Sequence, residues 1–308
     1  MEEFLEALKK FYEGCEDFPD EEVSVSRDGT VVVRGDVFRL GPFAKTQLCS
    51  RAGCSEKFFD VLSERNLADV LNAVLEDRKW LVRTRGRRIR ALLTNRYNVI
   101  DHKDVVEKVL PALKLSKVFF NTQDPSWDVL LDHIAVIRVE GERRKEEKTK
   151  TVYTPYLIIR NSEVGTGSVM IGLQLAFSRG LVLKQLMKIS HLSALKALEG
   201  LEDAVMYLFD LAPLIQKSCE VRVKIRPIDR RFFVFRYGRE LADTLWPGSK
   251  TDVSERTLGE LLEVTTLQRI PVEMRLRLQM DLFEVLVRAE DFVKEGWLVG
   301  WPGTGRAR

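Results

Sequence analysis

The side chains of this sequence that could do chemistry gather between Arg78 and Arg96, where eight residues are Arg or Lys and none is acidic. In the whole chain 49 Lys+Arg nearly balance 46 Asp+Glu, so this clustering carries more information than the net charge of +3. Guanidinium groups match phosphate oxygens in a bidentate geometry. The pattern predicts a phosphate track made of Lys79, Arg83, Arg85, Arg87, Arg88, Arg90 and Arg96. The alternative is a solvated edge hairpin whose charges prevent aggregation.

A second basic stretch, from Arg222 to Arg239, holds seven basic residues against Asp229 alone and alternates them with aromatic rings. Bases of single-stranded nucleic acid stack on such rings while cations follow the backbone. The residues predicted to take part here are Arg230, Arg231, Phe232, Phe233, Arg236 and Tyr237. Trp80 and Tyr97 would offer further stacking surfaces. The alternative is a core strand in which Phe233, Phe235 and Tyr237 point inward.

Carboxylates offer a different chemistry. Asp124, Asp128 and Asp132 are spaced four residues apart, and on a helix they would share a face able to hold a divalent cation. Pro125 and the strand-like residues that follow argue against that helix. The four cysteines and three histidines show no zinc-binding spacing, so no metal and no cofactor is expected. Glu163, in a polar turn, is expected to lie buried against an Arg.

Local patterns predict the elements that must position these residues. Residues 80–93 alternate about Gly86, and a second alternating pair of runs flanks Asp28-Gly29, so both segments are predicted β-hairpins. Residues 2–13 and 43–53 have helical periodicity, the latter ending at a glycine cap. Asp101 is the expected N-cap of a further helix, with Asp104 completing the cap. We expect Tyr97 and Asp101 to hold the shape of the basic stretch.

The order of these elements predicts the fold class. Strands and helices do not alternate strictly, which favours an α+β fold over a parallel α/β fold. We expect an antiparallel sheet with the basic β-hairpin packed against helices, followed by a C-terminal helical extension. The predicted division is an α+β core domain at 1–220 and a strand–helix extension at 221–308.

Composition also suggests a location. No apolar run has the length of a membrane span, and the amphipathic, acidic segment at residues 1–10 lacks the features of a signal peptide. Cysteines without a pairing pattern are typical of reduced cytosolic thiols. The expected location is the cytoplasm, which would be that of the host cell if the protein is encoded by a phage.

Two segments resemble a known family. Residues 89–97 (IRALLTNRY), followed by Asp101, are similar to the "R-A-x-L-S-x-R-Y…D" signature of the domain-of-unknown-function 932 family, found mainly in phages and plasmids. Residues 161–165 (NSEVG) match the N-S-E-V-G element of that family. The resemblance covers roughly residues 30–220, and residues 178–180 depart from the Cys-x-Asn-Gly turn that the family often has. Its mobile-element setting implies a role in DNA replication or recombination.

These observations lead to one principal hypothesis. The chain is expected to be a non-enzymatic, homo-oligomeric binder of single-stranded DNA, with RNA left open, that promotes strand annealing. The basic hairpin flanked by helices gives a further architectural analogy to phage single-strand annealing proteins of the Red-beta and RecT type. Two alternatives stay open: a metal-dependent nuclease that uses the aspartates or Glu163, and an assembly protein whose Arg-rich hairpin contacts neighbouring subunits.

Overall fold

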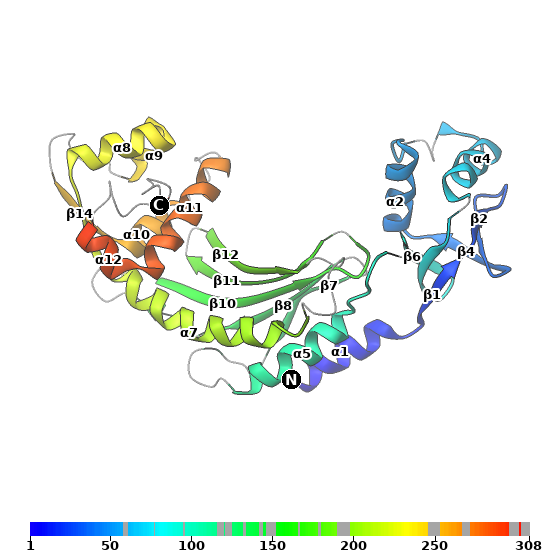
Figure 1. The fold of residues 1–308 in the computed structure, drawn as a ribbon, viewed down its shortest axis with the longest axis horizontal. Coiled ribbons are helices and arrows are strands. Elements are labelled where there is room, and N and C mark those ends of the chain that lie inside the picture. Colours follow the sequence, from blue (N-terminus) through cyan, green and yellow to red (C-terminus); the bar gives the residue numbers. More distant parts are fainter. Residues whose placement is uncertain are drawn as a thin grey trace.

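The computed structural model covers residues 1–308. It describes all of them except 58–60, 77, 95, 116–119, 121–124, 132–133, 142–143, 146–151, 166, 178–179, 190–197, 246–252, 267–271, 296–301 and 303–308. The described residues form a central sheet with a lobe at each end (Figure 1). The predicted α+β class, the antiparallel sheet and the C-terminal helices are confirmed.

The N-terminal lobe is a six-stranded sheet with helices on one face. In sheet order its strands are β1 (Cys15–Glu21), β5 (Trp80–Arg85), β6 (Arg88–Thr94), β4 (Asp36–Leu40), β3 (Val31–Val33) and β2 (Val23–Val25). Its helices are α2 (Pro42–Ala52) and α4 (Glu64–Leu75). All neighbouring strands are antiparallel except β4 and β6. Both predicted hairpins are present, with Gly86 and Gly29 at their turns in the left-handed conformation that glycine adopts easily.

The basic hairpin contributes to the core of this lobe. Trp80, Val82, Ile89 and Leu92 pack with apolar residues of α2 and α4. The opposite sheet face carries the alternate residues of the same strands, because successive side chains of a strand point to opposite faces. The hairpin is therefore packed against helices on one side, and on the other side Leu81, Ala91 and Leu93 form a smaller cluster with Val164.

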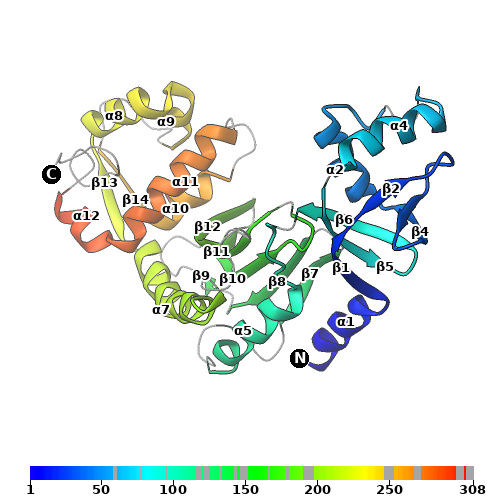
Figure 2. The same cartoon turned by 45° about the vertical axis from the view of Figure 1, so that its right-hand side comes forward.

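The central sheet is antiparallel, and its described helices α1, α5 and α7 cover one face. In sheet order its strands are β12 (Gly180–Ile189), β11 (Val169–Phe177), β10 (Val152–Asn161), β8 (Ile134–Glu140) and β7 (Ser126–Leu131), and the short β9 (Arg144–Lys145) also pairs with β10. Helices α1 (Glu2–Tyr12), α5 (His102–Leu115) and α7 (Leu201–Cys219) lie against one face (Figures 1 and 2). On the other face no described helix is drawn between the two lobes.

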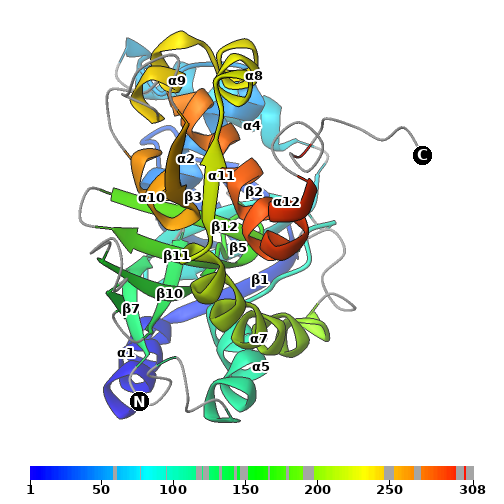
Figure 3. The same cartoon turned by 90° about the vertical axis from the view of Figure 1, so that its left-hand side faces the viewer.

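The C-terminal lobe consists mainly of helices. Its elements are β13 (Arg222–Ile225), α8 (Pro227–Tyr237), α9 (Arg239–Leu245), β14 (Ser254–Thr257), α10 (Leu258–Val264), α11 (Val272–Val287) and α12 (Ala289–Glu295). Strands β13 and β14 pair with each other, and the helices surround them (Figure 3). Apolar residues of this lobe share one continuous core with α7 and the central sheet. Residues on both sides of the predicted boundary at 220/221 thus contribute to the same core.

One predicted element is wrong in type. Residues 227–237 form a helix, where the alternation of basic and aromatic residues had suggested a strand. Pro227 occupies the first helical turn, and the Asp229 carboxylate accepts a hydrogen bond from the Arg226 backbone N–H at 2.8 Å. Both features favour the start of a helix. Phe233 and Tyr237 are buried one helical turn apart, whereas Phe235 is 93% exposed.

Candidate functional site

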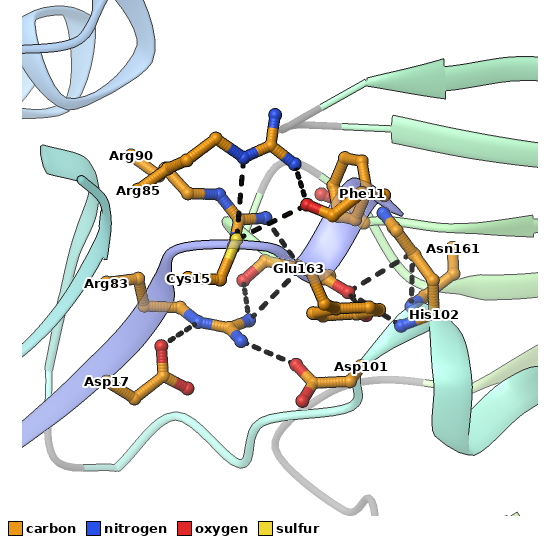
Figure 4. A network of polar contacts seen from close by, with 12 residues as sticks. Phe11, Cys15, Asp17, Arg83, Arg85, Arg90, Asp101, His102, Asn161 and Glu163 are labelled. Atoms are coloured by element: carbon orange, nitrogen blue, oxygen red, sulfur yellow. Dashed lines mark hydrogen bonds and ion pairs between the residues drawn. The ribbon is translucent and has the colours of Figure 1, made fainter. Parts of the chain in front are cut away.

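The arginines of the basic hairpin divide into two groups with different surroundings. Arg83 and Arg90 are almost completely buried, whereas Arg87 and Arg88 are exposed and Arg85 is half-buried. The division follows from what lies against the hairpin at each position. The turn between β10 and β11 packs against the middle of the hairpin, and it brings Glu163 to the buried pair (Figure 4).

The buried group forms what we call the Glu163 network. Its members are Tyr12, Asp17, Arg83, Arg90, Asp101, His102, Asn161 and Glu163. They come from α1, β1, the hairpin, the start of α5 and the end of β10, so the network joins the N-terminal lobe to the central sheet. The expectation that Glu163 lies against an Arg is confirmed, because Arg90 Nη2 donates to Glu163 Oε2 at 2.6 Å.

The Glu163 carboxylate accepts hydrogen bonds from several donors around it. Oε1 accepts from the backbone N–H of His102 at 2.7 Å and from the Tyr12 hydroxyl. Burial works against the ionised carboxylate, yet the pKa of Glu163 lies below its usual value. His102, the guanidinium groups of Arg83 and Arg90 and the backbone N–H of His102 all favour the charged form.

Arg83 links three acidic partners. Its Nε donates to Asp17 Oδ1 at 2.9 Å, another nitrogen donates to Asp101, and Nη1 donates to the Glu163 carbonyl at 2.9 Å. Burial alone would lower the pKa of Arg83, but Asp101, Glu163 and Asp17 raise it. This residue is therefore a charged, fully engaged part of the fold, and the prediction that it contacts phosphate is wrong.

His102 is held neutral in this environment. Its Nδ1 lies 3.0 Å from the Asn161 amide nitrogen, which can donate only if Nδ1 carries no proton. Burial lowers the pKa of His102 to about 4, with Arg90 and Arg83 acting in the same direction and Glu163 opposing them. At neutral pH the imidazole therefore adds no charge to the network.

Segments that resemble the phage and plasmid family lie together in this region. Tyr97 donates its hydroxyl to the Ser162 carbonyl at 3.1 Å, and Val164 packs with Ala91 and Leu93. Asp101 precedes α5 and accepts from Arg83, while its own backbone N–H donates to Asp104 at 2.9 Å. Tyr97 and Asp101 thus hold the shape of this region, as expected from the sequence.

The exposed group of arginines continues onto a neighbouring strand. Arg88 is the register partner of Arg39 on β4 and of Arg85 on β5. Arg39 and Arg88 point away from the helices, because their chain neighbours Phe38 and Ile89 belong to the core beneath α2 and α4. Arg85 lies on the same face because it is the register partner of Arg88. We call Arg39, Arg88 and Arg85 the arginine row. Sequence reasoning missed Arg39, since its position beside Arg88 depends on the parallel pairing of β4 and β6.

Two members of the arginine row, Arg39 and Arg88, have no carboxylate partner within the described part of the chain. Arg39 and Arg88 are exposed and make no ion pair there. Arg85 stacks on Phe11, with its Cζ 4.3 Å from the ring centroid, and donates to the Phe11 carbonyl. Its Nε also lies 3.5 Å from Cys15 Sγ. Arg39 and Arg88 lie directly opposite each other on neighbouring strands, where like charges are destabilising, so among the described residues their positive charge is not balanced.

Other predicted hairpin residues have ordinary surface partners or none. Arg87 pairs with Asp36 at 2.8 Å and Lys79 pairs with Glu22 at 2.7 Å, all four being exposed. Arg96 is exposed. These ion pairs leave Arg87 and Lys79 partly neutralised.

Several predicted stacking residues are buried and cannot receive a base in this conformation. Trp80 is fully buried, donates to the Leu75 carbonyl at 3.4 Å and is covered by Arg51. Phe233 and Tyr237 are in the core of the C-terminal lobe, and the half-buried Phe232 packs edge-on against Phe233. The prediction of a stacking surface on Trp80, Phe233 and Tyr237 is therefore wrong, whereas stacking on Phe232 stays a prediction.

In the second basic stretch, two of the three predicted arginines are paired with carboxylates. Arg230 pairs with Asp243, and Arg236 pairs with Asp281 at 3.1 Å. Arg231 alone among the predicted arginines of α8 is exposed to solvent. The predicted second phosphate contact in the C-terminal lobe thus reduces to one arginine.

The structure also bears on the alternative of a metal-dependent nuclease that uses the three aspartates. Asp128 lies on strand β7 and pairs with Arg138 at 3.2 Å, so the helical face assumed for the aspartates does not exist there. Asp124 and Asp132 lie outside the described residues. No cluster of three or more His, Cys, Asp or Glu side chains suited to a metal ion occurs among the residues that the structure describes.

Comparisons with known proteins add no relatives. No protein-family model matches the chain, and neither a curated protein nor a solved structure matches it. The resemblance to the phage and plasmid family therefore stays a prediction. Among the described helices, none is both long enough and apolar enough to cross a membrane.

Proposed function

We propose that this protein binds single-stranded nucleic acid through the arginine row. The observation that supports the proposal is the alignment of Arg39, Arg88 and Arg85 across three strands, together with the lack of a carboxylate partner for Arg39 and Arg88 among the described residues. Neighbouring strands are about 4.8 Å apart, so the row extends over about 10 Å. Phosphates of a single strand follow one another closely enough for two or more to lie along this length.

The surroundings of the row favour a phosphate backbone over a single buried anion. Arg39 and Arg88 are exposed, and Arg88 lies with its methylene groups over Gly41, where a Cβ atom would be 3.5 Å from them. An open, flat row of guanidinium groups can follow a chain of phosphates without selecting a sequence. We assign no catalytic residue, since the titratable groups nearby are engaged in the Glu163 network.

The proposal includes a homo-oligomer in the cytoplasm that promotes strand annealing. The described cysteines are free thiols, in keeping with a reducing compartment. The sheet edges at β7 and β12 have no further strand partner among the described residues, and such edges can pair with another chain. Native mass measurement with and without oligonucleotide tests the oligomer. Pairing of complementary strands, timed with and without protein, tests annealing.

Binding through the row is expected to depend steeply on salt, and Arg39→Gln/Arg88→Gln is expected to weaken that dependence. Each lost phosphate contact reduces the slope of log K against log salt concentration by about 0.7 for single strands, so the double variant should lose about 1.4. Fluorescence anisotropy of labelled oligo(dT), titrated at several salt concentrations, measures both affinity and slope. Arg85 is left in place because it is tied to Phe11 and Cys15.

A matched control removes two arginines that already have carboxylate partners. Arg34 pairs with Glu21 and Arg87 pairs with Asp36, both on the same lobe. The variant Arg34→Gln/Arg87→Gln changes the net charge by the same amount and should keep a slope close to that of the wild type. Absence of oligo(dT) binding by the wild type at low salt, or equal slopes for the two double variants, would contradict the proposal.

A further inference from the structure

The face of the central sheet that lacks helices carries a second set of side chains suited to nucleic acid. Apart from Ile158 and Gly172, which are buried, strands β8, β10 and β11 alternate between residues of the core and half-buried or exposed residues on the other side. The latter define what we call the open face: Arg138, Glu140, Thr154, Tyr156, Arg160, Met170, Gln174 and, on β12, Lys188. Helices α1, α5 and α7 lie on the opposite side (Figures 1 and 2).

A stacked pair occupies the middle of the open face. The Arg138 guanidinium carbon lies 4.8 Å from the centroid of the Tyr156 ring. Arg138 retains 38% exposure of its side chain although it also pairs with Asp128. Tyr156 is half-buried, and Gln174 is its register partner on β11. Aromatic rings and guanidinium planes are the groups on which unpaired bases stack.

Charges on the open face favour a polyanion. Arg160 and Lys188 flank Met170 in one cross-strand row, and neither has an ion-pair partner among the described residues. The acids on this face are Asp128, already paired with Arg138, and Glu140, beside Tyr156. Arg160 comes four residue steps after Tyr156 on β10, or about 13 Å along the strand. A single-stranded nucleic acid with a base on Tyr156 could therefore place neighbouring phosphates near Arg160 and Lys188.

We infer that the open face is a base-stacking platform for single-stranded nucleic acid, with Tyr156 and Arg138 receiving a base and Arg160 and Lys188 contacting phosphates. The inference rests on the proposed function, and it supplies the stacking surface that the buried rings of the hairpin and α8 cannot provide. It differs from the arginine row in the part of the ligand that it contacts. The row depends on phosphates, whereas the platform depends on bases.

Tyr156→Ala is expected to weaken binding of labelled oligo(dT) by about 5- to 100-fold, the range that one lost aromatic stack produces. The salt slope should stay close to that of the wild type because no phosphate contact is removed. Tyr156→Phe should retain wild-type affinity, since the ring and not the hydroxyl receives the base. Tyr207→Ala is the matched control, because Tyr207 is 54% exposed on α7, in the layer that covers the opposite face of the sheet.

An abasic oligonucleotide of the same length separates the platform from the arginine row. Tyr156→Ala should bind this probe as well as the wild type does, whereas Arg39→Gln/Arg88→Gln should bind it more weakly. An oligonucleotide substituted with 5-iododeoxyuridine should, on irradiation, cross-link to Tyr156, as identified by mass spectrometry of the digested protein.

The outcomes distinguish the two ideas. Unchanged oligo(dT) affinity in Tyr156→Ala, with cross-links elsewhere, overturns the platform and leaves the row standing. Loss of affinity in Tyr156→Ala together with no effect of the row variant supports the platform and overturns the row. If the wild type binds neither oligo(dT) nor the abasic probe at low salt, both are overturned.

Discussion

Replacement of Glu163 by glutamine is expected to lower the free energy of unfolding by about 3–5 kcal/mol, the usual effect of removing one partner from a buried ion pair. The amide has nearly the same volume, so packing is kept. It cannot neutralise Arg90, whose side chain is fully buried, nor the positive charge of Arg83. Urea unfolding followed by circular dichroism measures the change through the midpoint and the slope of the transition.

A surface pair provides the control for this expectation. Glu255 pairs with Arg222 at 3.4 Å, and both side chains are more than 40% exposed. Glu255→Gln should cost less than about 1 kcal/mol, as exposed ion pairs usually do. If Glu163→Gln were no more destabilising than Glu255→Gln, the buried charges would have to be compensated by another group, and the role of Glu163 as the centre of the network would be wrong.

A double variant tests whether the cost comes from the unpaired arginine. The double variant Arg90→Gln/Glu163→Gln has no charged side chain at either position of the buried pair. We expect the combined loss to be smaller than the sum of the two single losses, because residues within one network are coupled. Additive losses would indicate that Glu163 acts mainly through Tyr12 and the His102 backbone N–H rather than through Arg90.

The local structure of the basic hairpin could be predicted from the sequence, but which of its arginines are buried could not. Alternation about Gly86 is a property of neighbouring residues and is visible in the sequence. Arg90 is the extra residue of a β-bulge, since Arg83 is opposite Ala91 and Thr84 is opposite Ile89. The bulge turns Arg90 inward toward Glu163, a residue 73 positions away in the chain. Burial of a charge is decided by such distant partners.

Residues 227–237 show that the spacing of aromatic residues in a sequence can fit both a strand and a helix. Phe233, Phe235 and Tyr237 fit a strand if every second residue is counted, and Phe233 and Tyr237 fit one face of a helix. Pro227 and Asp229 were the decisive local evidence, because they suit the first turn of a helix. The sequence alone did reveal a buried acid–arginine contact at Glu163, but neither Tyr12 nor His102 could be assigned to it.

Acid is expected to weaken the fold between about pH 6.5 and pH 4, and His102 is the main reason. Its pKa is about 4 in the folded protein and about 6.5 when unfolded, so the unfolded chain binds more protons in this range. Stability therefore rises with pH across the window and is lost as pH falls, by up to about 3 kcal/mol for this one group. Urea midpoints measured at several pH values give the dependence.

Glu163 and Asp101, two other members of the network, also change protonation in acid. The lowered pKa of Glu163 adds stability that is present above its usual pKa of 4.5 and is lost as pH falls further. Burial raises the pKa of Asp101, although Arg83 opposes it, so Asp101 favours folding at the acidic end. Because Asp101 acts in the opposite direction to His102, the contribution of His102 is read from the difference between the wild type and a variant that lacks the imidazole.

The variant His102→Asn isolates the contribution of His102 to the pH dependence of stability. The asparagine carbonyl can accept the hydrogen bond that Asn161 now donates to Nδ1, and it does not titrate. The variant should show a nearly flat pH dependence across the window even if its stability at neutral pH is lower, because the slope depends only on protons taken up on unfolding. A slope equal to that of the wild type would mean that His102 is accessible to protons in the folded protein, and the buried, neutral imidazole described above would be wrong.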